Sequence, residues 1–331
     1  MRKFTKRLLS SLALGALAAS FAVTGGCGKK DDEKYIVVIC KSQDEYWDST
    51  KQGAFDAAEE LDIKLDFNAP VNEDSEQQVT MIYDAINMKA DAIVLAPIND
   101  DERTIDAVKK AAASGIPVIT IDDDITCDER IACIKTENTF GGAIAGRAVE
   151  NIMPEGGDIA IVSHTVTSKT AQLRTEGFRS QLEADGGEAY KIIRTEDCGG
   201  DIQLSKEITK KLINENDGLT MIYTTNQPST IGACQAIAEE GAGARVNLVG
   251  FDFFNKAGDH ESAETYIESG VLDGVIVQNP YNMGYLGVRY AHKYTEGNKV
   301  SANIDTGAYL VTKDNMNDAD IQLLLYPTKT K

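Results

Sequence analysis

The chain has 331 residues, which allows one to three domains, and we expect two. Its hydrophobic content of 42% and its modest share of aromatic residues are ordinary for a globular protein, so the composition excludes a disordered chain. The formal net charge is −19, whereas nucleic-acid binding requires a basic stripe on the surface. The charge therefore argues against a nucleic-acid-binding protein.

The first 26 residues have the features of a bacterial secretion signal. Basic residues at the start precede an apolar run at 8–23, which is too short and too rich in Ala and Ser for a membrane-spanning helix. The end of this segment resembles a lipobox, although Thr24 stands where Leu or Val is usual. We expect a lipoprotein signal peptide at 1–26, a lipid on Cys27, and a charged tether at 27–34. The alternative is a secreted protein with an unmodified cysteine.

Residues 35–61 form the first structural unit and set the pattern for the rest. The run at 35–39 is apolar and rich in β-branched residues, which is typical of a strand buried on both faces of a parallel sheet. Apolar residues recur at helical spacing over 47–61. The polar loop 41–46 between them lies at the carboxyl end of the strand, where open α/β sheets bind their ligands.

Strands and helices alternate from there to the end of the chain. The pattern predicts further strands at 65–67, 92–95, 118–121, 131–135, 159–162, 221–223, 246–251, 274–277 and 308–311. It predicts helices at 75–88, 104–113, 140–152, 170–182, 201–214, 229–239, 257–268 and 282–294. About ten strands are too many for one evenly covered sheet, so we predict an α/β protein with two doubly wound parallel-sheet lobes.

Several motifs, taken together in their order and spacing, resemble one known family. They are the aromatic pair Tyr46-Trp47, GIPVITID (115–122), TENTFGGAIAG (136–146), RTEGF (174–178), TTNQPSTIGACQAI (224–237), LVGFD (248–252) and VQNPYNMGYLGV (277–288). They are similar to the sugar-binding class of type I periplasmic binding proteins, the receptors of ABC importers. The resemblance implies two lobes, 35–136 plus 280–304 and 138–278 plus 307–331, joined by three crossovers with a ligand cleft between them.

The same resemblance implies which side chains line the cleft. Hydroxyl groups of a sugar need matched hydrogen-bond partners, and an aromatic ring can pack on the apolar face of the sugar ring. The positions that match the family's ligand-binding residues are Tyr46, Trp47, Asp122, Asn226, Asp252 and Gln278. The alternative roles are a helix cap for Asp252, a turn for Asn226, and core packing for Trp47.

Other positions depart from the ribose-type pattern and make the expected cleft more acidic. Asp123 and Gln172 stand where arginines are usual, Arg174 lies two residues beyond, Asp44 replaces an Asn, and Lys41 is in the first loop. We include all five among the candidate ligand-binding residues. We expect Lys41 or Arg174 to offset the acidic charge, or the ligand to carry a cation, as an amino sugar does. Some autoinducer-binding relatives have a similar lysine and acid, so a furanosyl signal molecule is a further alternative to ribose.

No motif indicates a catalytic residue, a cofactor or a metal. The chain has no GxGxxG or Walker loop, and its three histidines are far apart in sequence. Residues 314–322 only loosely resemble a calcium loop, because Met316 occupies a position that requires oxygen, and a capped terminal helix fits better. Cys127 and Cys133 flank a short segment, so they could meet across a turn in a disulfide.

These observations favour a receptor over an enzyme. The expectation is an extracytoplasmic, lipid-anchored, monomeric solute-binding protein that closes its cleft on a small carbohydrate and delivers it to the permease subunits of an ABC transporter. The main alternative is a sensor that presents a sugar or furanosyl autoinducer to a membrane receptor. A LacI-type repressor shares the fold but needs a basic helix-turn-helix before the first strand, where this chain has an export signal.

Overall fold

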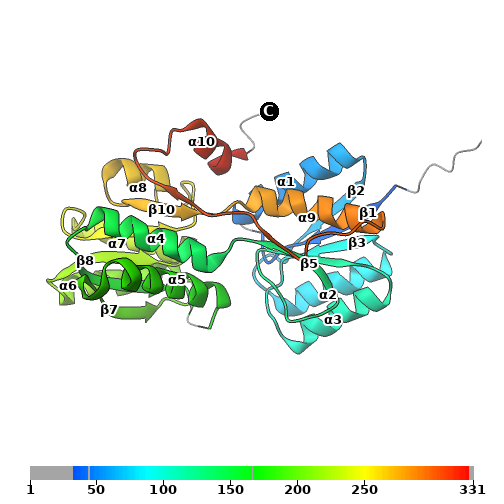
Figure 1. Cartoon of the computed structure of the whole chain (residues 1–331), viewed down its shortest axis with the longest axis horizontal. Helices are drawn as coiled ribbons and strands as arrows, with labels where there is room; N and C mark the ends of the chain where they lie inside the picture. Colours follow the sequence, from blue (N-terminus) through cyan, green and yellow to red (C-terminus); the bar gives the residue numbers. More distant parts are fainter. Residues whose placement is uncertain (1–32, 44, 166, 328–331) are drawn as a thin grey trace, which may run out of the picture. The chain divides into compact units, whose positions relative to one another are not determined.

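The computed structural model describes residues 33–43, 45–165 and 167–327 (Figure 1). The predicted signal peptide and Cys27 lie outside the described residues, as does Asp44. The described part contains two six-stranded sheets with helices on both faces. This arrangement confirms the predicted α/β class with two parallel-sheet lobes.

The first sheet is wholly parallel and has the strand order β11-β5-β4-β3-β1-β2. Its strands are β1 (Tyr35–Ile39), β2 (Lys64–Asn68), β3 (Ala92–Leu95), β4 (Val118–Ile121), β5 (Arg130–Lys135) and β11 (Asn303–Asp305). Every residue of β3 and β4 is buried, as expected for strands covered on both faces. The direction of winding reverses between β1 and β3, so the loops after these two strands diverge and leave a crevice.

The second sheet has the equivalent order β12-β10-β9-β8-β6-β7, with its reversal between β6 and β8. Its strands are β6 (Gly157–Ser163), β7 (Tyr190–Asp197), β8 (Leu219–Thr224), β9 (Asn247–Phe251), β10 (Gly274–Val277) and β12 (Tyr309–Val311). One strand departs from the prediction of parallel sheets, because β12 runs antiparallel to β10. The chain leaves the sheet at the carboxyl end of β10 and later returns to the sheet at that same end of the strands. The returning strand β12 therefore runs in the opposite direction to β10.

The helices divide between the two sheets. Those of the first sheet are α1 (Glu45–Leu61), α2 (Ser75–Asn87), α3 (Glu102–Ala113) and α9 (Pro280–Thr295). Those of the second are α4 (Asn138–Ile152), α5 (Lys169–Asp185), α6 (Ile202–Glu215), α7 (Gln227–Glu240), α8 (Ala263–Ser269) and α10 (Ala319–Leu325), with a 3₁₀ turn at Gly187–Ala189. Helix α8 begins later than predicted because Ser262, which accepts a hydrogen bond from the amide of Thr265, caps it.

Alternate residues of the central strands supply a hydrophobic core on each face of the sheet. In β1, Ile36 and Val38 belong to a buried cluster that includes residues of α1 and α9, whereas Val37 and Ile39 belong to one that includes residues of α2 and α3. Helix α9 therefore packs on the first sheet, although it follows β10 of the second in sequence (Figure 1).

Three crossover segments connect the two sheets, at 136–137, 278–279 and 306–308. The first and third each bond to the end of the strand that leads into the other: the amide of Thr306 donates to the carbonyl of Lys135 at 3.0 Å, and the amide of Glu137 donates to the Asp305 carboxylate at 3.0 Å. The crossovers thus leave each lobe at neighbouring points. The lobe limits given above stay a prediction.

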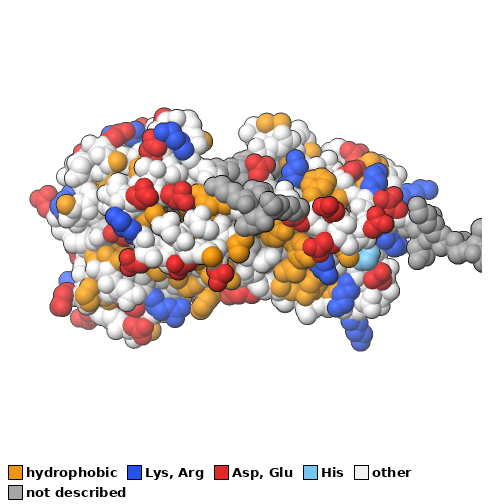
Figure 2. All heavy atoms as spheres, turned by 90° about the horizontal axis from the view of Figure 1, so that it is seen from above, with side chains coloured by type: hydrophobic (Ala, Val, Ile, Leu, Met, Phe, Trp, Pro, Cys, Tyr) orange, Lys and Arg blue, Asp and Glu red, His pale blue; other side chains and the backbone are white. Residues whose placement is uncertain are grey.

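The surface and the cysteines add two observations about the described residues. Figure 2 shows acidic and basic side chains interspersed over one face, and no described helix has the length and apolar character needed to cross a bilayer. In this part of the chain, Cys127, Cys133, Cys198 and Cys234 are free cysteines. Cys127 and Cys133 are therefore not joined in a disulfide: Cys127 instead donates to Glu129 at 3.1 Å, while Cys133 is buried.

Candidate functional site

A cavity of about 550 Å³ lies among the carboxyl ends of strands from both sheets. Its size falls within the range typical of small-molecule sites. Nine of the residues predicted from the sequence line it, namely Lys41, Tyr46, Trp47, Asp122, Asp123, Arg174, Asn226, Asp252 and Gln278. The winding of both sheets explains this convergence, because the strand ends on either side of each reversal open toward the same crevice.

Asp122 and Asp252 occupy equivalent places in the two sheets. Each follows the strand next to its sheet's crossover strand, with φ of 66° at Asp122 and 69° at Asp252, in the left-handed region that residues other than glycine rarely adopt. The amide of each donates to the neighbouring strand, from Asp122 to the Ile134 carbonyl and from Asp252 to the Ile276 carbonyl. This shared backbone turn places one carboxylate from each lobe on the wall of the cavity.

Lys41 compensates the carboxylates of the first lobe. Its ammonium lies 2.7 Å from Asp122 Oδ2 and 2.5 Å from Asp123 Oδ2. Burial opposes the charge of this lysine, but the attraction of the two carboxylates is stronger in sum and raises its pKa above the ordinary value. Lys41 is thus charged at every physiological pH. Because this one positive charge is shared between two carboxylates, this group of three residues has a net charge of −1.

Tyr46 and Trp47 lie at the start of α1 and differ in their surroundings. The Tyr46 hydroxyl donates to Asp122 Oδ1 at 2.8 Å, and burial together with the charges of Asp122 and Asp252 raises the tyrosine's pKa. Trp47 is only 5% exposed and belongs to the core cluster of the first lobe, while its ring edge meets Tyr46 at a centroid distance of 5.0 Å. Trp47 therefore has the alternative role of core packing, even though it also lines the cavity.

Arg174 compensates the carboxylate of the second lobe. Its Nη1 lies 3.5 Å from Asp252 Oδ2, and Gln278 Nε2 donates to Asp252 Oδ1 at 2.7 Å. Burial raises the pKa of Asp252, whereas Arg174 and Gln278 oppose this rise by stabilising the charged form. The backbone amide of Gln227 is a third hydrogen-bond donor to this carboxylate. A carboxylate has about four acceptor positions, so Asp252 retains capacity for about one ligand hydroxyl.

Asn226 combines two roles. It is the N-cap of α7, where its Oδ1 accepts from the amide of Ser229 at 3.0 Å and the Ser229 hydroxyl accepts from the amide of Asn226. Its local role is thus a helix cap and not the turn that was the predicted alternative to ligand binding. The cap uses only Oδ1, and Nδ2 of Asn226, which also lines the cavity, has no protein partner among the described residues.

His164 also lines the cavity, although no sequence motif indicated it as a ligand-binding residue. Its ring nitrogens lie 2.8 Å from Thr225 Oγ1 and 3.0 Å from Ser168 Oγ. Burial, followed by the positive charges of Arg174 and Lys41, lowers its pKa to about 3, so the ring is neutral. Its place directly after β6 was the signal available in the sequence.

One predicted residue of the described part does not line this cavity. Gln172 is exposed and lies in a separate surface groove of α5, where it adjoins Thr175 and Glu176. The helical geometry explains this, because Gln172 and Arg174 are two positions, or about half a turn, apart and so project to different sides of α5. Asp44 lies outside the described residues. The remaining lining includes Asn99 and Asp100, which follow β3 and which the sequence motifs did not indicate.

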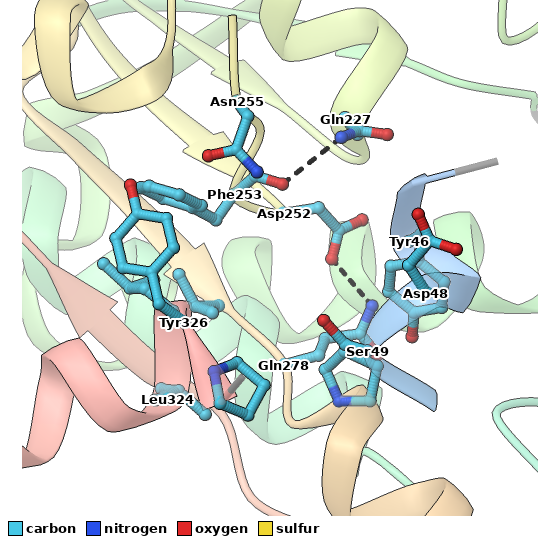
Figure 3. Close-up of a pocket in the computed structure, with 14 residues that line it drawn as sticks. Tyr46, Asp48, Ser49, Gln227, Asp252, Phe253, Asn255, Gln278, Leu324 and Tyr326 are labelled. Carbon is cyan, nitrogen blue, oxygen red and sulfur yellow. Dashed lines mark hydrogen bonds between the residues drawn. The ribbon is translucent and has the colours of Figure 1, made fainter. Parts of the chain in front are cut away.

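A second, smaller cavity of about 270 Å³ shares part of its lining with the first (Figure 3 shows the smaller one). The residues that line both cavities are Tyr46, Gln227, Asp252 and Gln278. The far side of the smaller cavity is formed by the end of α10 and by Tyr326, whose ring packs edge-on against Phe253. The C-terminal segment thus covers the side of the site that faces the crossovers.

Comparisons with known proteins were made for the whole chain. A family model described as "Periplasmic binding protein domain" matches residues 35–299. The ribose import binding protein of Salmonella typhimurium is 26% identical over 300 residues, which cover 91% of this chain and 97% of that protein. Two solved structures are similar: a carbohydrate transporter solute binding protein from Agrobacterium radiobacter in complex with D-arabinose (30% identity, TM-score 0.79, covering 89% and 99% of the two chains) and a sugar transporter from Clostridium phytofermentans (32%, 0.73, covering 85% and 100%).

Proposed function

Because the chain belongs to the periplasmic binding protein family, we propose that it is an extracytoplasmic receptor that binds a small carbohydrate and delivers it to an ABC permease. The observation that carries the proposal is the pair of compensated carboxylates, Asp122 and Asp252, one from each lobe on a single cavity wall. A carboxylate accepts hydrogen bonds from two adjacent hydroxyls, and such charge-assisted bonds are stronger than neutral ones. The names of the relatives, which are sugar-binding proteins of importers, support the same ligand class.

Contacts from both lobes give a reason for cleft closure on the ligand. A sugar held by Asp122 alone or by Asp252 alone leaves half of its hydroxyls to water, whereas the closed form satisfies both halves. The ligand therefore binds the closed form more strongly and shifts the population toward it. No bond of the ligand needs to change, and the cavity supplies recognition only.

The charge balance of the cavity bears on the ligand's chemistry. Among the innermost groups, Lys41 and Arg174 face three carboxylates, those of Asp122, Asp123 and Asp252. The two cations offset most of the negative charge, so an uncharged sugar fits. The excess of one carboxylate excludes anionic ligands such as sugar phosphates, because a like charge in a partly desolvated site is destabilising.

The proposal is tested by titrating the protein with a panel of sugars. Trp47 is the only tryptophan of the chain and lines the cavity, so its fluorescence reports on occupancy without a label. The panel holds D-ribose, D-arabinose, D-fucose, D-glucosamine and D-ribose 5-phosphate, and calorimetry confirms each hit. We expect at least one neutral sugar or the amino sugar to bind and the phosphate not to bind. Binding of the phosphate alone contradicts the proposal, as does a failure of every sugar to bind.

Sensing is the second candidate, and it is favoured by one observation, the ion pair of Lys41 with Asp122. A lysine in the first loop and an acid after the fourth strand are the features that this chain shares with autoinducer-binding relatives. Adding a furanosyl autoinducer to the same panel separates the two: tighter binding of this molecule than of any sugar favours sensing.

We also propose that Cys27 carries the lipid that anchors the protein to the cell membrane. The support is the sequence alone, with its short apolar segment and the small residues before the cysteine. Expression of the full chain and of Cys27→Ser tests it by detergent phase partition. The unaltered protein is expected in the detergent phase and the variant in the aqueous phase.

A further inference from the structure

Asn138, the first residue of α4, makes two hydrogen bonds in opposite directions. Its Oδ1 accepts from Arg174 Nε at 2.8 Å, and its Nδ2 donates to the carbonyl of Thr136 at 3.1 Å. The side chain is only 2% exposed and does not line the cavity. Asn138 thus joins a cavity residue to the first crossover without being placed to touch a ligand itself.

The same arginine is connected to the other crossovers. Arg174 faces Asp252, and Asp252 accepts from Gln278, which begins the second crossover. The Thr136 hydroxyl donates to the carbonyl of Gly307 in the third crossover at 3.5 Å. A continuous set of buried polar groups therefore runs from the cavity wall to all three segments that join the lobes.

The packing of two helices fixes the distance between Asn138 and Arg174. Glycines allow the backbones of α4 and α5 to touch, since a Cβ on Gly142 would lie 2.1 Å from the Arg174 carbonyl and a Cβ on Gly177 would lie 1.9 Å from the Thr139 carbonyl. No side chain separates the two helices at this point. Arg174 is accordingly held against the first turn of α4, where Asn138 is the residue that meets it.

Among the described residues, the Arg174 guanidinium has two other contacts besides those with Asn138 and Asp252. Nη1 donates to the carbonyl of Thr225 at 2.8 Å, and the guanidinium lies over the Phe251 ring at 3.7 Å from its centroid. These contacts hold one edge and one face of the planar group. Asn138 accepts the hydrogen bond from Nε and so fixes how the guanidinium is rotated within its own plane. This rotation determines whether Nη1 points toward Asp252.

We propose that Asn138 is a positioning residue that orients Arg174 for ligand binding and couples this arginine to the first crossover. The proposal rests on the proposed sugar-binding function and adds a residue outside the cavity that controls it. A ligand that draws Arg174 and Asp252 toward its hydroxyls pulls on Thr136 through Asn138. Ligand contact and bending of the crossover are then linked by hydrogen bonds and not only by the shape of the lobes.

Two substitutions separate the two hydrogen bonds of Asn138. Asn138→Asp keeps an acceptor for Arg174 Nε and removes the donor to Thr136, whereas Asn138→Leu removes both at similar size. Asn216→Leu is the control, because Asn216, although only partly buried, also donates to a backbone carbonyl, that of Leu212, in a helix that does not adjoin the crossovers. Unfolding curves of all three variants establish that they fold.

Three measurements are compared with the unaltered protein. They are the Kd of the tightest sugar among D-ribose, D-arabinose and D-fucose, the decrease in radius of gyration on binding that sugar, and the NMR signal of the Arg174 Nε–H in the ligand-free protein. We expect Asn138→Leu to weaken binding at least tenfold and to shift the Nε–H signal. We expect Asn138→Asp to keep the affinity within about threefold and the signal protected, but to reduce the decrease in radius.

Several results would overturn the proposal. An unshifted Nε–H signal or unchanged affinity in Asn138→Leu removes the positioning role, and full compaction in Asn138→Asp removes the coupling. If Asn138→Leu does not fold, Asn138→Asp alone tests the positioning role. Loss of the Arg174 Nε–H protection in Asn138→Asp would then contradict that role. If the unaltered protein binds none of the sugars, the proposed function fails, while the NMR signal still tests Asn138 independently.

Discussion

Asp122 and Asp252 each end a strand in a left-handed backbone conformation, which costs roughly 1–2 kcal/mol for a residue other than glycine. The same strain at equivalent places of both sheets indicates that the direction of these carboxylates matters more than local stability. Each carboxylate is also matched to a cation of its own lobe, Lys41 or Arg174. The polar groups of each half are thus arranged before a ligand arrives, which lowers the cost of binding.

Asp252→Asn tests the contribution of the carboxylate in the second lobe. Asparagine keeps the size of the side chain but withdraws the negative charge from Arg174, which is 4% exposed. We expect the free energy of unfolding to fall by about 2 kcal/mol, the value of a hydrogen bond to a charged group, and sugar affinity to fall at least tenfold. Asp106→Asn, on the exposed face of α3, is the matched control and should change neither. Urea unfolding and calorimetry make the comparison.

His164 predicts a specific dependence of stability on pH. Its pKa is about 3 in the folded protein and about 6.5 in the unfolded chain, so below pH 6.5 the unfolded state binds the proton first. The stability tied to this histidine is therefore complete above pH 6.5 and is lost as the pH falls toward 3. His164→Gln, which can still bond to Thr225 and Ser168, should lose less stability than the unaltered protein between about pH 7.5 and about pH 5.

The pH prediction is checked by urea midpoints at both pH values for the two proteins. Other groups titrate over the same pH range in both proteins. The difference between the stability changes of the two proteins therefore reports on His164 alone. Equal changes in the two proteins would show that this ring is not held neutral by its surroundings.

At the scale of the elements, close contact between helix backbones supports each lobe. In the second lobe, Gly142 and Gly177 bring α4 against α5, and in the first lobe Gly53 and Gly284 bring α1 against α9 in the same way. In each pair one helix, α4 or α9, begins directly after a crossover. In each lobe, the helix that follows a crossover is therefore held in backbone contact with another helix of the same lobe.

Gly177→Ala is expected to force α4 and α5 apart, because the added methyl would meet the backbone carbonyl of Thr139. Overpacking of this kind costs about 1–3 kcal/mol. Gly218→Ala is the control, because its added methyl would meet only the carboxylate end of Asp158, at 3.3 Å, and this side chain can move. The unfolding free energy of Gly218→Ala should therefore stay within about 0.5 kcal/mol of the unaltered value. Chemical denaturation of both variants checks this; equal stability of the two would contradict the packing argument.

The central strands and the strand-end residues could be predicted from the sequence, because a buried parallel strand is a continuous apolar run and its next residue lies at the ligand-binding edge. Asp122 and Asp252 occupy such positions, and the resemblance to the family is what indicated them as ligand-binding residues. The direction of β12 was not, since it depends on where the chain re-enters the sheet. The half-exposed edge strand β7 and the three-residue β11 were missed because neither has a continuous apolar run. Likewise, which of Gln172 and Arg174 faces the cavity depends on the rotation of α5 about its axis, which no motif specifies.

At the scale of the molecule, the two sheets share one strand order, one point of reversal and one place for an acidic residue. The three crossovers join them at neighbouring points, and the set of buried polar groups around Arg174 reaches each crossover. A change in the angle between the lobes therefore requires rearrangement at few residues. This is the arrangement expected for a hinge whose position depends on the ligand.

Small-angle scattering with and without the sugar that binds most tightly in calorimetry tests the central claim most directly. Because the ligand is proposed to contact Asp122 of one lobe and Asp252 of the other, saturation should decrease the radius of gyration, and a sugar from the panel that does not bind should leave it unchanged. Tight binding of the sugar with no decrease in the radius would contradict the account.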